Sequence, residues 1–271
     1  MGLFNLFTNT STLFFAGCAT KKYPGSVELQ ERILDRLNIP FENEETSKCC
    51  GISLLEQGYE IEGRKFIRAN FENLKINGIK RLITFCPKCF KAFKQDYPEI
   101  LPDWNLEVTN LWDLILEKLE SRPRLIKHKE NETVGFQDSC YLGRYCNIYD
   151  SPREILKLLG YEIKEFQNSR ENSACCGSCG DYNIINPAVA DQMAKERIIE
   201  AKRIGLKKIV VLSLEECELL RKNSQEIEIL EFSEILALGL GIKKPKKSEE
   251  EKIIETEIKE EIIEEIDISG N

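Results

Sequence analysis

The sequence predicts an α/β protein made of two tandem, pseudo-symmetric α/β units with mainly parallel sheets, followed by an acidic C-terminal helix. Short apolar runs alternate with stretches of helical periodicity, as they do when strands and helices alternate along a chain. The landmarks of the first half recur in the second half at a nearly constant offset. The chain has 271 residues, 42% of them apolar and 31% charged, which is typical of a protein with a sizeable core.

The first unit is predicted from five segments. An apolar run at 13–16 predicts a buried strand, and residues 26–38 have helical spacing. A short run follows near Phe41. A second helix is expected at about 61–76, and 81–85 form another buried-strand candidate that leads directly into a Cys-Pro-Lys-Cys sequence.

The second unit repeats this order. Residues 134–136 begin it, a helix is expected near 152–159, and a strand at 161–163 follows. A longer helix is expected at 187–204, and 208–212 form the last buried-strand candidate. Cysteines follow the strands in both units, at the carboxyl ends where open α/β sheets place their sites.

The repeat defines the domain organisation. Cys18 and Cys140 are 122 residues apart, and Cys89 and Cys217 are 128 apart, so the second copy differs only by small insertions. We expect a first domain at 1–97, a connecting segment at 98–132, a second domain at 133–238 and a tail at 239–271. In the connecting segment, Trp104, Leu111, Trp112, Leu114, Ile115 and Leu119 are expected to form a core helix on the sheet.

Charge excludes some partners. The net charge is −8, and 249–267 alone hold ten acids and two lysines, so the rest of the chain is balanced. No basic field for nucleic acid is present, and no run of about 20 apolar residues predicts a membrane span. The acidic tail carries isoleucines at 254, 258, 262 and 266, one stripe of a helix. It is either a solvated appendage or a helix that docks on a partner subunit.

The eleven cysteines are odd in number and clustered, which favours metal or cluster binding in a reducing compartment over a disulfide framework. No Lys or Arg precedes Cys18, so the positive region of a signal peptide is missing. We therefore expect a cytoplasmic protein.

Two cysteine doublets, Cys49-Cys50-Gly51 and Cys175-Cys176-Gly177, carry the strongest chemical signal. Neighbouring residues do not easily form a disulfide, because their Cα atoms are only about 3.8 Å apart. They can bind different iron atoms of one cluster, and the following glycine lets the backbone turn closely around it. The candidate ligands in the first unit are Cys18, Cys49, Cys50, Cys86 and Cys89. Four such thiolates would also suit zinc.

The pattern Cys-x30-Cys-Cys-Gly followed by Cys-Pro-x-Cys resembles the cysteine-rich CCG domain found in one of the subunits of heterodisulfide reductase and in related iron–sulfur subunits of glycerol-3-phosphate, glycolate and lactate dehydrogenases. In the second unit, the segments 138–144, 149–154 and 170–177 resemble the second repeat of that family. The resemblance covers about 13–225. It implies two domains that can each hold a [4Fe-4S] cluster, which is a non-cubane cluster with five cysteine ligands in the heterodisulfide reductases.

Carried over to this chain, the resemblance implies Cys140, Cys175, Cys176 and Cys217 as ligands of the second cluster, beside the five of the first. The second unit departs from the family, because Leu214 replaces the first cysteine of the closing Cys-Pro-x-Cys. Cys179 is a candidate for the missing ligand, whereas Cys146 is expected to be a buried thiol. The second site would then hold a cubane, an altered non-cubane cluster or none.

The resemblance implies an oxidoreductase, namely the iron–sulfur subunit of a multi-subunit enzyme. It would exchange electrons with a disulfide, a quinone or a partner dehydrogenase, and its partner would be a flavoprotein or a ferredoxin-type iron–sulfur protein. The only histidine, His128, is expected to be solvated, so a Ser-His or Cys-His catalytic pair is not predicted. The alternative is a zinc-binding or scaffold protein without redox activity.

Overall fold

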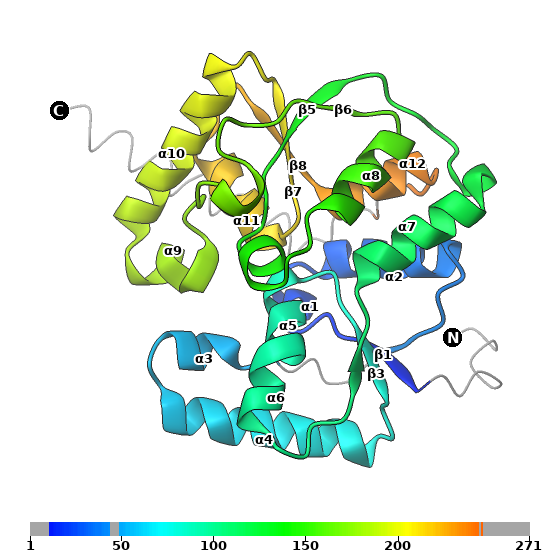
Figure 1. Cartoon of the computed structure of the whole chain (residues 1–271), viewed down its shortest axis with the longest axis vertical. Coiled ribbons are helices and arrows are strands. Elements are labelled where there is room, and N and C mark those ends of the chain that lie inside the picture. Colours follow the sequence, from blue (N-terminus) through cyan, green and yellow to red (C-terminus); the bar gives the residue numbers. More distant parts are fainter. Residues whose placement is uncertain (1–10, 44–48, 244, 246–271) are drawn as a thin grey trace.

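The computed structural model describes residues 11–43, 49–243 and 245. They form two four-stranded sheets with the strand orders β2-β1-β3-β4 and β6-β5-β7-β8. All strand pairs among the described residues are parallel. The two orders are the same when strands are numbered within each unit, so the predicted α/β fold with two similar units is confirmed (Figure 1).

The first unit contains four strands and the helices that follow them. The strands are β1 (Thr12–Phe14), β2 (Glu42–Asn43), β3 (Arg81–Ile83) and β4 (Glu107–Val108); the helices are α1 (Ala19–Lys22), α2 (Pro24–Arg36), α3 (Ile52–Glu56), α4 (Glu60–Ile76), α5 (Pro87–Lys91), the π-helix η1 (Ala92–Asp96), α6 (Tyr97–Ile100), α7 (Leu111–Ser121) and the 3-10 helix η2 (Pro123–Leu125).

The second unit has the same order of elements. The strands are β5 (Thr133–Phe136), β6 (Glu162–Ile163), β7 (Lys208–Val211) and β8 (Glu228–Glu231); the helices are the π-helix η3 (Tyr141–Tyr145), α8 (Asp150–Leu158), the 3-10 helices η4 (Arg170–Asn172) and η5 (Cys179–Asp181), α9 (Tyr182–Ile185), α10 (Pro187–Arg203), α11 (Leu214–Lys222) and α12 (Phe232–Gly239).

Each sheet is buried on both faces, and the alternation of side chains along its strands shows how. In β1, Phe14 belongs to a core cluster that reaches both units, whereas Leu13 faces a cluster with α4 and α5. In β7, Val210 belongs to the shared cluster and Ile209 faces α10 and α11. Successive side chains of a strand point to opposite faces, so apolar runs without alternating polarity are what a doubly covered parallel sheet needs.

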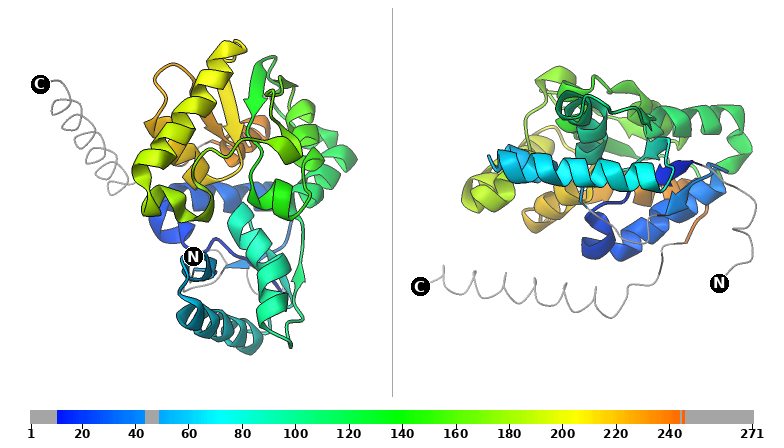
Figure 2. Two further views of the ribbon diagram at one scale, coloured as in Figure 1. Left: turned by 60° about the vertical axis from the view of Figure 1, so that its left-hand side comes forward. Right: turned by 90° about the horizontal axis from the view of Figure 1, so that it is seen from below.

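The shared core lies between the two sheets and is built on four helices. Helix α2 packs on α12, and α7 packs on α8, with their apolar side chains in one cluster. Figure 2 shows α4 on the outside of the first unit and α10 on the outside of the second. Trp112 of α7 is fully buried in the shared cluster, as expected for a core residue.

Some elements differ from the prediction. Trp104 lies before α7 and packs against Phe71 and Tyr97 instead of joining the helix. The edge strands β4 and β8 were not predicted, because β4 has only two residues and both strands carry glutamates. The acidic helix predicted at the C-terminus lies outside the described residues. None of the helices in the described part is long and apolar enough to cross a membrane.

Candidate functional site

Five cysteines of the first unit come from three loops at the carboxyl end of its sheet. Cys18 follows β1 and precedes α1, the doublet Cys49-Cys50 precedes α3, and Cys86 and Cys89 lie at the start of α5. Cys50 and Cys89 are buried, whereas Cys18 is exposed. The site therefore has a buried floor and one thiol at its rim.

Pairwise contacts join these thiols. Cys49 interacts with Cys18 and with Cys50, and Cys89 interacts with Cys50 and with Cys86. The hydrogen bond from Cys18 is the largest of the effects that lower the pKa of Cys49, to about 2. The same hydrogen bond raises the pKa of Cys18, since a second thiolate so close would be repelled. A positive charge among these sulfurs would favour the thiolate form of several of them together.

Two buried polar side chains hold the backbone of the doublet by hydrogen bonds to its carbonyls. The Asn70 amide of α4 donates to the Cys49 carbonyl at 2.7 Å, and the Tyr97 hydroxyl of α6 donates to the Cys50 carbonyl at 2.9 Å. The Asn70 amide also donates to the Tyr97 hydroxyl at 3.2 Å. Neither residue was predicted from the sequence. Asn70 could have been recognised, because it is a polar residue within the apolar stripe of α4 that includes Ile67 and Leu74.

Gly51 provides a test of how tightly the doublet is held. Its φ is +78°, and a Cβ there would lie 2.6 Å from the Phe66 ring. Gly51→Ala is expected to destabilise the fold by more than the roughly 1–2 kcal/mol of a left-handed alanine, and to lower the metal content. Gly58→Ala is the matched control, because Gly58 has φ +88° and open space around it. Urea unfolding of both variants measures the difference, and equal losses would contradict the steric account.

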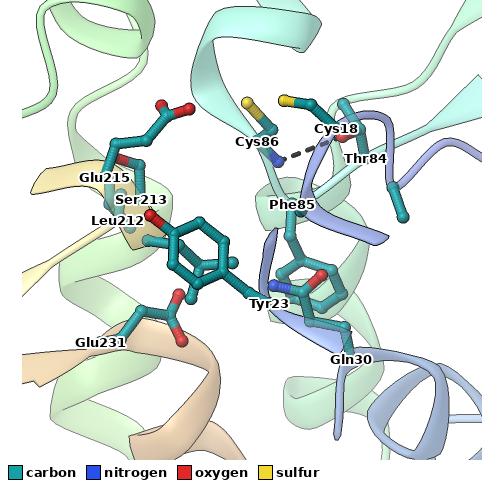
Figure 3. A pocket seen from close by; sticks show the side chains of 13 residues that line it. Cys18, Tyr23, Gln30, Thr84, Phe85, Cys86, Leu212, Ser213, Glu215 and Glu231 are labelled. Atoms are coloured by element: carbon teal, nitrogen blue, oxygen red, sulfur yellow. Dashed lines mark hydrogen bonds between the residues drawn. The ribbon is translucent and has the colours of Figure 1, made fainter. Parts of the chain in front are cut away.

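A cavity of about 30 Å³ lies beside Cys18 and Cys86, between the two units. Figure 3 shows the two sulfur atoms next to each other, with Tyr23, Ser213 and Glu215 across from them. Leu214, which replaces the family cysteine, also lines this cavity. The altered motif of the second unit thus forms part of the wall of the first site.

The second group of cysteines is smaller than the first. Cys140, which follows β5, interacts with Cys175 and with Cys179. The hydrogen bond from Cys175 lowers the pKa of Cys140, but the contact with Cys179 and burial outweigh it and raise that pKa to about 11. Arg144 donates to the Cys140 sulfur at 2.9 Å. The Gly177 amide donates to the Cys175 sulfur at 3.4 Å, as the Gly51 amide does to Cys49 at 3.4 Å.

The remaining cysteines have different surroundings. Cys176 is buried, and its sulfur lies 3.4 Å from the Ser178 hydroxyl. Cys217 is buried in the core cluster that β7, α10 and α11 form in the second unit. Burial raises its pKa, and Arg221 and Glu231 are the charged groups that affect it most. Cys146 is half-buried near Lys91. Of the predicted set for the second site, Cys140, Cys175 and Cys179 interact with one another, Cys176 lies beside Cys175 in the doublet, and Cys217 lies in the core.

A buried lysine connects the two groups. Lys88, between Cys86 and Cys89, contacts the Asp181 carboxylate at 2.6 Å, the Glu56 carboxylate at 3.2 Å and the Ser53 hydroxyl at 2.7 Å. The Tyr141 hydroxyl, next to Cys140, donates to Glu56 at 3.0 Å. We call this network (Ser53, Glu56, Lys88, Tyr141 and Asp181) the Lys88 bridge. Sequence reasoning did not predict it.

The cysteine-rich domain model named CCG matches residues 12–94 and 134–228. These two segments contain both cysteine groups and most of each sheet. The chain belongs to the CCG cysteine-rich domain family. The resemblance drawn from the motifs is thereby confirmed, and the two matches coincide with the two structural units.

Three curated relatives of this CCG protein are oxidoreductases by name. It is 28% identical over 196 residues to one of the subunits of the dihydromethanophenazine:CoB–CoM heterodisulfide reductase from Methanosarcina barkeri, covering 70% of this chain and 48% of the relative. It is 32% identical over 176 residues to EtfAB:quinone oxidoreductase of Syntrophomonas wolfei, covering 62% and 24%. A third relative is FadF of Bacillus subtilis, described as a probable iron-sulfur-binding oxidoreductase, at 35% over 124 residues, covering 45% and 17%. The CCG chain spans less than half the length of each.

The first site of the CCG chain fits an iron–sulfur cluster in its donors. Five thiols from three loops interact with one another at one edge of the sheet, and thiolates are the usual protein ligands of such clusters. Gly17, just before Cys18, has φ +62°, and a Cβ there would lie 2.9 Å from the Phe15 ring, so the turn that presents Cys18 requires glycine.

Proposed function

We propose that this chain is an iron–sulfur redox subunit of a multi-subunit oxidoreductase related to heterodisulfide reductase. Cys18, Cys49, Cys50, Cys86 and Cys89 are the ligands of a [4Fe-4S] cluster, in the non-cubane form that the family resemblance implies. The observation that carries the proposal is the convergence of these five thiols from three loops of one sheet edge.

Such a cluster accepts and releases electrons one at a time, at a potential set by burial, hydrogen bonds and charge. The chain's own residues supply these three conditions. Cys50 and Cys89 are buried, so water is excluded from that side of the site. The backbone amides of Gly51 and Cys89 donate hydrogen bonds to the sulfurs of Cys49 and Cys86, at 3.4 Å each. Lys88 adds a buried positive charge between two ligands. Cys18 is the exposed ligand, so the rim beside it is where a partner or acceptor would approach.

The electron donor in this proposal is a flavoprotein or a ferredoxin-type iron–sulfur protein, because the described residues show no nucleotide or flavin motif. The acceptor is a quinone, a partner dehydrogenase or a disulfide. We favour an electron relay over disulfide reduction at the cluster, since the second unit lacks one cysteine of its motif at Leu214. A reducing compartment such as the cytoplasm would keep the thiols free.

Metal analysis tests the cluster assignment. The full chain, purified without oxygen, is expected to contain iron and acid-labile sulfide in equal amounts. Zinc without iron or sulfide would overturn the redox assignment and favour the alternative, a zinc-binding or scaffold protein. The thiolate set alone does not distinguish the two metals.

Electron paramagnetic resonance separates the two redox roles. If the chain is a relay, a disulfide added to the half-reduced protein leaves the cluster spectrum unchanged. A new paramagnetic signal on half-reduction with the disulfide would instead show that a substrate sulfur binds at the cluster, and would replace the relay with disulfide reduction.

A further inference from the structure

We propose that the acidic segment 249–267 docks on its own chain, over a small basic surface on the side of the molecule away from the cysteines. We call this surface the η2 surface. It consists of the bases Arg122, Arg124, Lys127, Lys129 and Lys243 and the apolar side chains of Leu125, Ile126, Leu238 and Ile242. The segment lies outside the described residues, so its chemistry is taken from the sequence. The docking goes beyond the proposed function, because it needs no metal at either group of cysteines.

The five bases of the η2 surface are exposed. No ion pair within the described part of the chain includes any of them. The acids that flank them in the sequence are Glu120 and Glu130, so the surface keeps a net positive charge. The segment 249–267 holds ten acids and two lysines. The two are therefore complementary in charge, which favours one orientation of contact and speeds its formation.

The described chain ends beside the η2 surface. The Lys127 amide donates to the carbonyl of Gly239, the last residue of α12, at 2.7 Å, so the loop before β5 runs along the end of that helix (Figure 1). A Cβ at Gly241 would lie 3.2 Å from the Lys127 side chain. Glu249 follows Lys243 by six residues, a span of at most about 20 Å. A short linker of this kind gives an effective concentration of about 1 mM, so weak contacts suffice.

Apolar side chains lie among the bases. Leu238 is 48% exposed, and Leu125, Ile126 and Ile242 are half-buried at the edge of the shared core. A single exposed leucine needs no explanation. The segment, however, carries isoleucines at 254, 258, 262 and 266, which is one face of a helix. An amphipathic helix with acidic flanks fits an apolar strip bordered by cations.

The η2 surface and the cysteines lie at opposite edges of the second sheet. Lys127 and Lys129 precede β5 and lie at its amino end, whereas Cys140 follows its carboxyl end. A segment docked on the η2 surface leaves the cysteine-bearing edge open. The tail and a partner that exchanges electrons thus use different surfaces.

Carbodiimide cross-linking of the full chain tests the docking, because the reagent joins a lysine amine to a carboxylate that touches it. A mixture of unlabelled and isotope-labelled chains, read by mass spectrometry, separates links within one chain from links between chains. We expect Lys127 and Lys129 to be joined to 249–267 within one chain, at least about five-fold more than the exposed Lys65 and Lys80 of the first unit. Raising the salt from about 0.05 to 0.5 M should lower this yield, because it screens exposed charges.

Two variants with the same change in charge test the bases. Arg122→Glu combined with Arg124→Glu keeps both reporter lysines and is expected to lower their cross-link yield at least about five-fold. Lys65→Glu combined with Lys80→Glu is the matched control and is expected to leave the yield unchanged. Circular dichroism checks the fold of both proteins.

Two further variants test the apolar contact at constant charge. Ile258→Gln combined with Ile262→Gln removes two residues of the stripe and is expected to lower the yield in the same way. Ile253→Gln combined with Ile263→Gln changes isoleucines outside the stripe and is expected to keep it.

Three results would overturn the proposal. Equal yields at Lys127, Lys129, Lys65 and Lys80 would show a segment that stays in solvent or waits for a partner subunit. Links found only between differently labelled chains would assign the η2 surface to the segment of a second copy. Equal yields in the two charge variants would show that the bases do not hold the segment. Iron and sulfide content of the same samples tests the proposed cluster separately.

Discussion

Replacement of Cys86 by serine is expected to remove the iron of the first site while leaving the fold intact. Cys86 is the N-cap of α5, and its sulfur accepts a hydrogen bond from the Cys89 amide. Serine is a favourable N-cap residue, so the helix keeps its first turn. The hydroxyl is a poor substitute for a thiolate, and the loss of a ligand should exceed the roughly 10–100-fold loss of metal affinity caused by removing an outer-shell partner.

Iron and sulfide per chain, together with the visible absorption of the protein, measure this effect. Cys146→Ser is the matched control, because Cys146 is also a half-buried cysteine but lies near Lys91 and Asp96, outside both groups. Circular dichroism checks the fold of both variants. Iron content equal to that of the wild type in Cys86→Ser would show that Cys86 is not a ligand.

The order of strands and helices was predictable because each sheet is covered on both faces. Val210 and Ile209 both have to be apolar, since they face different core clusters, and such runs are visible in a sequence. The meeting of Cys18, the doublet and Cys86 was predictable for a related reason: parallel strands end at one edge of the sheet. The edge strands β4 and β8 carry glutamates and give no such signal.

The second cysteine group was harder to predict, because a ligand role depends on where a sulfur points. Cys217 follows β7 just as Cys89 follows β3, but Cys89 contacts Cys50 whereas Cys217 packs in the core near Arg221. A side chain's direction on a helix is set by packing with distant elements. Cys179 has no counterpart in the first unit; its position in the loop after the doublet made it a candidate for the second site, and in the structure it interacts with Cys140.

The Lys88 bridge was even harder to predict from the sequence than the second cysteine group. Lys88 lies in a Cys-Pro-Lys-Cys sequence, where a lysine would ordinarily be solvated. Its partner Glu56 precedes it by 32 residues, and Asp181 follows it by 93. Ion pairs between residues so far apart have no local pattern, so only the packed arrangement of the two units shows that this cation is buried.

Lys88→Met is expected to destabilise the protein by about 3–5 kcal/mol, the range found when one partner of a buried ion pair is removed. The Lys88 side chain is 9% exposed, and those of Glu56 and Asp181 are 21% and 13% exposed. Burial lowers the pKa of Lys88, but its hydrogen bond to Asp181 and the charge of Glu56 outweigh burial and raise that pKa. The lysine is therefore charged, and its loss leaves two carboxylates facing each other in a poorly hydrated space.

Urea unfolding of the full chain measures the loss, with Lys91→Met as the matched control. Lys91 lies on the same helix, and among the described residues its one ion-pair partner is Asp96, at 2.6 Å, so its loss leaves one carboxylate instead of two. The bridge also predicts a coupling: Asp181→Asn should cost less in the Lys88→Met background than in the wild type, because there it removes one of the two facing carboxylates and relieves their repulsion. In the protein that contains iron, removal of this positive charge should also make the reduction potential more negative. A loss below about 1 kcal/mol, as for an exposed pair, together with additive effects of the two substitutions, would show that the bridge does not hold the two cysteine groups together.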